Sequence, residues 1–168
     1  MSKFMNRVVA GAMVASLGLS ATLAHAAPVT ASATARARIL KQITVTNTSD
    51  LDFGTIVAGA SASTVAVSTG AVRTCGAGLT CTGTVTAANF DISGTNNAVV
   101  TITGDNSVTL ANGTGGTMSA SLSRSASSLT LTNSAIGGSF QVGGTLSLAA
   151  NQADGAYAGT FNVTVDYQ

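Results

Sequence analysis

Apolar and polar residues alternate in short runs along most of the chain beyond residue 38, and small polar residues separate the runs. Successive side chains of a β-strand point to opposite faces, so this period of two predicts strands. The first is expected over residues 39–46, with Ile43 and Val45 on one face, and residues 47–50 are expected to form a turn. About ten such strands and the lack of apolar residues at helical spacing predict one all-β domain, an immunoglobulin-like β-sandwich, with a closed barrel as the alternative.

The last fourteen residues carry the clearest alternation of the chain. From Thr160 onward every even position is polar, and the odd positions are glycine or apolar: Gly155, Tyr157, Gly159, Phe161, Val163, Val165 and Tyr167. The pattern predicts a half-buried strand with an apolar inner face. No strand follows it, so one of its edges is expected to be open to another polypeptide. The alternative is an ordinary closing strand of an all-β domain.

The spacing within this ending resembles the C-terminal motif of chaperone-usher fimbrial subunits, the pilins. Tyr167 is the penultimate residue and Gly155 is fourteenth from the end, with Phe161, Val163 and Val165 between them. The resemblance implies that these five residues border an acceptor groove, left where an immunoglobulin-like domain lacks a strand. A periplasmic chaperone would fill the groove first, and the N-terminal extension of the next subunit would then replace it at an outer-membrane usher. The product would be a homopolymeric surface fibre.

A second resemblance covers most of the chain. The stretch SDLDFGTIVAG at residues 49–59, together with the ending GTFNVTVDY, resembles a family of small secreted bacterial proteins of unassigned function, which itself looks pilin-like. These motifs are mostly structural, so they support the fold more than the function.

The N-terminus predicts export. Lys3 and Arg7 precede an uncharged apolar stretch over residues 8–23, and a small-x-small site ends at Ala26. These features predict a signal peptide, residues 1–26, cleaved between Ala26 and Ala27. A membrane anchor is the alternative, for which the stretch is short and weakly apolar. The mature protein is expected to pass through the periplasm to the cell surface without inserting into a membrane.

Residues 27–38 form the candidate donor strand, an N-terminal arm ahead of a sandwich domain at residues 39–168. One parity of the arm is apolar, and the opposite parity is polar or basic. The apolar set is Val29, Ala31, Ala33, Ala35 and Ala37. Most of these are alanines, each of which buries little area. The alternatives are a disordered tail or the beginning of the first strand.

Cys75 and Cys81 are the only cysteines. In an exported chain they are expected to form a disulfide. Since few residues separate them, the bond is expected to staple a local hairpin or loop rather than to join sheets. A metal pair lacks the histidines of a zinc site, and the spacing differs from a Cys-x-x-Cys redox motif.

The remaining chemistry is sparse. Without the signal peptide, five basic residues face six aspartates, so the net charge is −1 and no basic field for nucleic acid exists. No histidine remains and glutamate is absent, which argues against an enzyme and against a bound cofactor. Asp50 and Asp52 are a weak candidate for calcium. The expected function is a structural fibre subunit, and the alternative is a self-contained secreted sandwich that binds a carbohydrate or a cell-surface partner.

Overall fold

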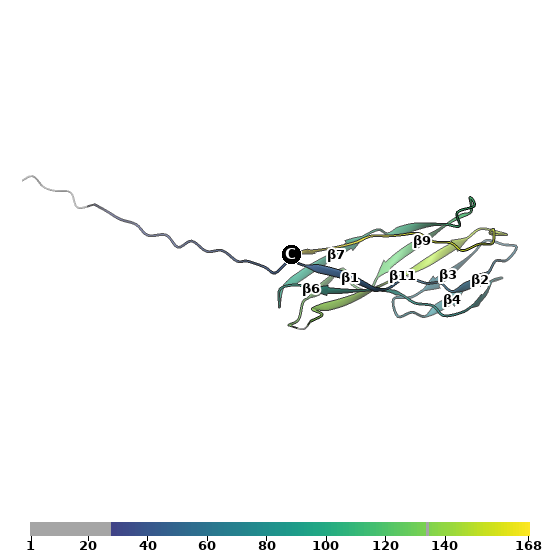
Figure 1. The fold of residues 1–168 in the computed structure, drawn as a ribbon, viewed down its shortest axis with the longest axis horizontal. Coiled ribbons are helices and arrows are strands. Elements are labelled where there is room, and N and C mark those ends of the chain that lie inside the picture. Colours follow the sequence, from purple (N-terminus) through teal and green to yellow (C-terminus); the bar gives the residue numbers. More distant parts are fainter. Residues whose placement is uncertain (1–27, 134) are drawn as a thin grey trace, which may run out of the picture. The chain divides into compact units, whose positions relative to one another are not determined.

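The computed structural model describes residues 28–133 and 135–168, and all the regular elements among them are strands (Figure 1). The expected signal peptide and its cleavage site at Ala26 and Ala27 lie outside the described residues. The chain divides into a unit that ends at Ala37 and a second unit, Arg38–Gln168. In the first unit, residues 28–37 have no regular secondary structure and all are exposed. Over residues 28–133 and 135–168, no helix is long and apolar enough to cross a membrane.

The described residues of the second unit form twelve strands, slightly more than the alternation predicts. In chain order they are β1 (Thr44–Ser49), β2 (Thr55–Val57), β3 (Ser63–Val67), β4 (Arg73–Cys75), β5 (Thr80–Thr82), β6 (Ala88–Ser93), β7 (Val99–Gly104), β8 (Ser107–Ala111), β9 (Thr117–Arg124), β10 (Ser128–Thr130), β11 (Gly138–Leu148) and β12 (Val163–Tyr167).

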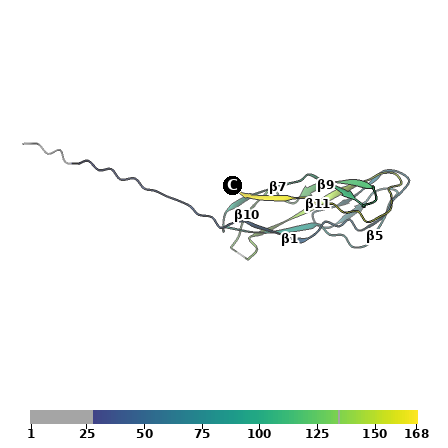
Figure 2. The same ribbon diagram turned by 45° about the horizontal axis from the view of Figure 1, so that its top comes forward.

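Every pair among these strands is antiparallel, and the strands form three sheets. The largest has seven strands in the order β1-β6-β11-β3-β4, with β9 also paired to β11 and β8 to β9. The long β11 pairs with β6 through its first half and with β3 through its second half. The smaller sheets have the orders β10-β7-β12 and β2-β5. Figure 2 shows β7 and the yellow C-terminal strand in one layer and β1 in the opposite layer. The all-β, sandwich-like prediction is therefore confirmed.

The core between the layers consists of two clusters of apolar side chains. The first gathers around Phe90 and Phe140, whose rings stack with centroids 5.2 Å apart. The second gathers around Val65 and Leu146, from the two paired strands β3 and β11. Three partly buried residues pack against both clusters and so join them: Leu51, Leu122 and Phe161. Phe161 lies two residues before β12, so the C-terminal segment helps to hold the two halves of the core together.

The first strand differs from the sequence prediction. It begins at Thr44 instead of residue 39, and Asn47 to Ser49 lie inside it instead of in a turn. These residues pair with β6 through a register shift between Asn47 and Ser49. β1 is an edge strand with mostly exposed side chains. Polar residues are tolerated there, and the backbone hydrogen bonds to β6 outweigh the local turn preference of the sequence.

Candidate binding groove

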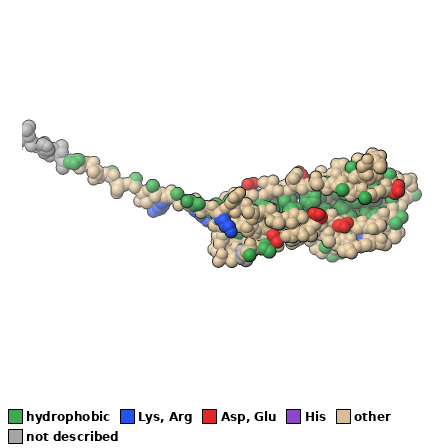
Figure 3. All heavy atoms as spheres, in the orientation of Figure 1, with side chains coloured by type: hydrophobic (Ala, Val, Ile, Leu, Met, Phe, Trp, Pro, Cys, Tyr) green, Lys and Arg blue, Asp and Glu red, His purple; other side chains and the backbone are tan. Residues whose placement is uncertain are grey.

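An apolar groove opens between two segments that are far apart in the sequence. Its volume is about 600 Å³, and its walls are residues 51–58 on one side and 152–157 on the other. The floor consists of Leu110, Met118, Leu146 and Leu148. Figure 3 shows apolar side chains gathered in a hollow on this face of the domain. The floor residues belong to the second core cluster or pack against it, so the groove exposes part of the core itself.

The first wall is the continuation of β1. Asp52 exchanges two backbone hydrogen bonds with Thr86, at 2.9 and 3.2 Å, and β2 then pairs with β5. Phe53 is buried in the second cluster, which anchors the wall to the core. The backbone hydrogen-bond partners of this segment are therefore β5 and Thr86, which follows β5.

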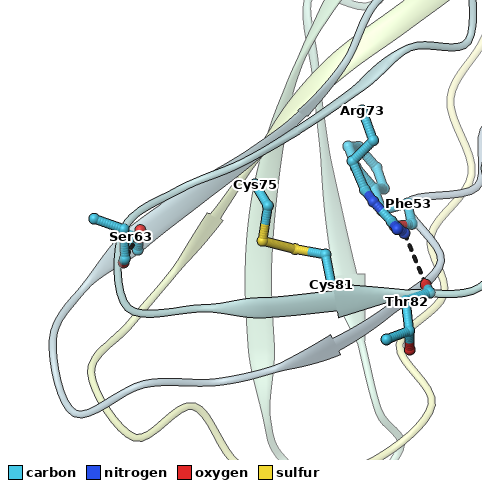
Figure 4. Close-up of a disulfide and its surroundings, with 7 residues drawn as sticks. Phe53, Ser63, Arg73, Cys75, Cys81 and Thr82 are labelled. Atoms are coloured by element: carbon cyan, nitrogen blue, oxygen red, sulfur yellow. Dashed lines mark hydrogen bonds between the residues drawn. A yellow bond between two sulfur atoms is a disulfide. The ribbon is translucent and has the colours of Figure 1, made fainter.

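The Cys75–Cys81 disulfide ties this wall to the large sheet, as Figure 4 shows. Cys75 lies in β4 of the seven-stranded sheet and Cys81 in β5 of the two-stranded sheet. The prediction of a disulfide is confirmed, but the expectation that it would not join sheets is wrong. The chain changes sheet within the loop between the two cysteines, so a bond that is short in sequence connects two sheets. Arg73 adds hydrogen bonds to the carbonyls of Phe53, at 3.3 Å, and Thr82, at 2.7 Å.

The second wall leads into the terminal strand. Gly155 has a φ of +144°, a backbone conformation that favours glycine, and a Cβ there would meet the Asn112 side chain at 3.1 Å. Tyr157 donates a hydrogen bond to the carbonyl of Ala153 at 2.8 Å, which folds the wall back on itself. Ala158 then exchanges two backbone hydrogen bonds with Ala111, at the end of β8. Just before this wall, the amide of Asn151 donates to the carbonyl of Gly59 at 3.0 Å, so the two walls are also linked at one end.

The alternating apolar side chains of the terminal segment lie against the first core cluster. Val165 is buried, whereas Phe161, Val163 and Tyr167 are only partly buried. The Phe161 ring meets the edge of the Phe90 ring with centroids 6.3 Å apart. The even positions from 160 to 168 are all exposed. The inner face of the segment is therefore apolar but incompletely covered.

One edge of β12 has no partner strand, because β12 ends the order β10-β7-β12. In an antiparallel pair, alternate residues direct their backbone groups to the partner and the others direct theirs away. The carbonyl of Asn162 accepts a hydrogen bond from the amide of Asp105, at 3.0 Å. The amide of Gln168 likewise donates to Val99, at 3.0 Å. By alternation, the residues whose backbone groups face the open edge are Val163, Val165 and Tyr167.

The edge across from β12 belongs to β1. Val45 pairs with Ile92, so it shares the inner face with a fully buried residue, yet 36% of its own surface is exposed. At this end Tyr167 connects the two edges: its hydroxyl donates to the carbonyl of Lys41 at 2.6 Å and accepts from the amide of Thr95 at 2.7 Å. Tyr167 thus ties the apolar face between β1 and β12 at this end.

Charged side chains lie at the rim and none lies inside. Two aspartates line the groove, Asp52 on the first wall and Asp154 on the second. Within residues 28–133 and 135–168, no acidic side chain forms an ion pair with a basic one. The same residues hold no group of three or more potential metal-ligating His, Cys, Asp or Glu side chains. The groove therefore offers apolar contacts, with carboxylates at its margin.

The structure brings together some of the sequence-predicted residues and separates others. Gly155 lines the groove, and the same segment continues to Phe161, Val163, Val165 and Tyr167, which lie at the first core cluster. The candidate donor residues Val29, Ala31, Ala33, Ala35 and Ala37 are all exposed and belong to no strand. Sequence reasoning missed the first wall and the floor residues Leu110 and Met118. The only sequence feature that could have indicated the first wall was the apolar stretch over residues 51–58, and this stretch is equally typical of an ordinary core strand.

The fold thus defines the class of this protein. It is an all-β domain with an open strand edge and an exposed apolar groove. Residues 43–167 match the family described as a domain of unknown function, DUF4402, and the chain belongs to that family. No curated protein and no solved structure shows a significant match to the chain.

Proposed function

We propose that this protein is a structural subunit of a bacterial surface fibre, in which each copy accepts a β-strand from its neighbour. One observation carries the proposal: β12 has a free edge, and the segment that leads into it, residues 152–157, forms one wall of an apolar groove that exposes part of the core. An extended peptide added to such an edge gains main-chain hydrogen bonds, and its alternate side chains gain apolar contacts below. The same edge in an isolated domain is a liability for aggregation.

The apolar interior supports the need for an added strand. Phe161, Val163 and Tyr167 point to the core but stay partly exposed, as do Leu110 and Met118 on the floor. A strand laid between β1 and β12 covers these side chains. Burial of apolar surface stabilises by roughly 25 cal/mol per Å², so covering a few hundred Å² contributes several kcal/mol.

The N-terminal arm of another copy is the proposed donor. Residues 28–37 have no strand partner, and the chain first becomes fixed at Lys41, whose amide donates to the Thr95 hydroxyl at 2.7 Å. Residues 28–40 number thirteen, as do residues 155–167, which run from the groove wall to the end of β12. At about 3.3 Å per residue, each extends to roughly 43 Å. The arm therefore has the length and the alternation to cover the whole groove.

The contact is asymmetric, since an arm meets a groove instead of another arm. Such head-to-tail contacts generate open filaments when the rotation between copies does not close a ring. Export through the periplasm, with a chaperone strand in the groove before assembly at an outer-membrane usher, completes the proposal. A chaperone is needed because the uncovered groove would otherwise associate with any extended chain.

Carbohydrate binding, the alternative function, finds less support. Sugar sites commonly use an exposed aromatic ring, and in the described part of the chain none of the phenylalanines or tyrosines is fully exposed. Phe53, Phe90 and Phe140 are buried in the core.

A parity experiment on the arm tests the proposal. Ala33→Asn combined with Ala35→Asn places amides on the apolar parity, and Ser32→Asn combined with Thr34→Asn is the matched control on the polar parity. The first pair is expected to abolish polymers of the mature chain and the control to leave them intact. Both pairs should leave the unfolding of the monomer unchanged, because all four side chains are exposed. Equal polymer yields from parent, test and control would contradict the proposal.

A further inference from the structure

Positive and negative charges are segregated along the mature chain. Residues 28–41 carry Arg36, Arg38 and Lys41 and no acid. Residues 42–168 carry two arginines and six aspartates, a side-chain charge of −4. Neither group is neutralised within the chain, since no ion pair joins charged side chains in the described ranges. The basic residues are concentrated at the end of the arm that is nearest to its own domain.

The two arginines of the domain are already engaged with neutral groups. Arg73 donates to two backbone carbonyls, and Arg124 donates to the carbonyl of Asp105 at 3.1 Å and to the Asn106 side chain at 3.0 Å. Both of these side chains are half-buried. They therefore brace loops and leave the aspartates uncompensated, including the pair at the groove.

Those two aspartates stand on opposite walls of the wide part of the groove. Asp52 precedes β2 and accepts a hydrogen bond from the amide of Gly54 at 2.8 Å, which holds its carboxylate in place. Asp154 lies on the facing wall, and both side chains are exposed. A strand lying in this part of the groove passes between two carboxylates.

We infer that Asp52 and Asp154 recognise the basic end of a neighbouring copy's arm and so determine which way the arm lies in the groove. This inference rests on the proposed function. When the apolar parity of the arm faces the floor, Arg36 and Arg38 lie on the opposite, outward parity, where their long side chains reach the rim on either side. The two rim aspartates and the two arginines of the arm can therefore form ion pairs between neighbouring copies.

The pairing fixes the direction of the added strand. With residues 36–38 beside Asp52 and Asp154, the N-terminal end of the arm points toward Tyr167, so the arm runs antiparallel to β12. Ile39, whose side chain is 91% exposed in the isolated chain, then lies next to the groove floor and its two walls. In the reverse direction the arginines would lie far from both rim carboxylates, and the wide part would receive only Val29 and alanines.

Exposed ion pairs contribute little to affinity, but they guide association and suppress wrong registers. Steering by complementary charge raises association rates by about 10-fold to 1,000-fold and weakens as salt is added. The electrostatic signature is therefore expected in the rate of polymer growth and in its salt dependence.

Charge reversal of the full mature chain tests the inference. We measure polymer growth by light scattering for three variants. The first carries both Arg36→Asp and Arg38→Asp, the second carries both Asp52→Arg and Asp154→Arg, and the third carries all four changes. Each one-sided reversal is expected to slow growth about tenfold at low salt, and the four-fold variant is expected to recover most of the parental rate. The difference should vanish at about 0.5 M salt, where screening acts over a few Å. Asp91→Arg, which changes an aspartate of β6 outside both the groove lining and β12, is the control.

A cross-linking experiment determines the direction of the arm in the groove without relying on growth rates. Copies with Ala37→Cys are mixed with copies that carry Ala156→Cys, and a second mixture replaces the first partner by Val29→Cys. A disulfide between copies is expected in the first mixture under mild oxidation and not in the second.

The outcomes separate the two claims. Parental growth by the one-sided reversals, no recovery in the four-fold variant, or cross-linking at residue 29 instead of 37 would overturn the inference and leave strand donation standing. A parent chain that forms no polymer and captures no synthetic peptide of residues 27–41 would overturn strand donation and the inference with it.

Discussion

Truncation of Phe161 to alanine is the most informative single change, because this ring serves both the fold and the groove. It packs against both core clusters and meets Phe90 edge-on with centroids 6.3 Å apart. Removing a fully buried phenylalanine costs about 3–5 kcal/mol. Phe161 is only partly buried, so we expect roughly half of that, about 2 kcal/mol.

The assay is urea unfolding of the monomeric mature chain, followed by circular dichroism because the chain has no tryptophan. With a slope of about 2 kcal/mol per M, the Phe161→Ala midpoint should fall by about 1 M. Thr164→Ala is the control: Thr164 is exposed on the opposite face of β12, and its midpoint should stay within about 0.25 M of the parent.

The second readout is assembly. An added strand covers Phe161 further, so Phe161→Ala should reduce polymer formation more than its effect on the monomer explains, even well below the unfolding midpoint. The reasoning is refuted if Thr164→Ala destabilises as much as Phe161→Ala. It is also refuted if Phe161→Ala leaves the midpoint unchanged, since the ring would then not support the core.

Three further changes test the surroundings of the groove. Replacing Cys75 and Cys81 by serine should cost only about 2 kcal/mol in a melting experiment, because the closed loop is short, and thiol labelling of the exported parent should find no free thiol. Tyr167→Phe removes the hydroxyl that links β12 to the chain before β1, and it should lower the unfolding free energy by about 1–2 kcal/mol in urea titration. Gly159→Ala brings a Cβ into a clash with the backbone oxygen of Thr109, so it should lower the melting temperature by several degrees, whereas a neutral result would show that the two segments separate easily.

The sequence by itself determined the class of fold and the face of the last strand. Alternation is a local property, and it is strongest from Phe161 to Tyr167, where each apolar side chain lies on the inner side of the structure. The disulfide was equally predictable, because a chain with only two cysteines allows only one pairing between them. These features need no knowledge of distant residues.

Tertiary structure decided where the groove lies and what surrounds it. The walls at residues 51–58 and 152–157 are about 100 residues apart, and only the sheet order places them on either side of one floor. Asn47 to Ser49 joined a strand because β6 supplied hydrogen-bond partners that no local pattern reveals. The disulfide joined two sheets because the chain changes sheet between β4 and β5. Pairing between strands distant in sequence is a collective result of packing and hydrogen bonding, so local periodicity does not encode it.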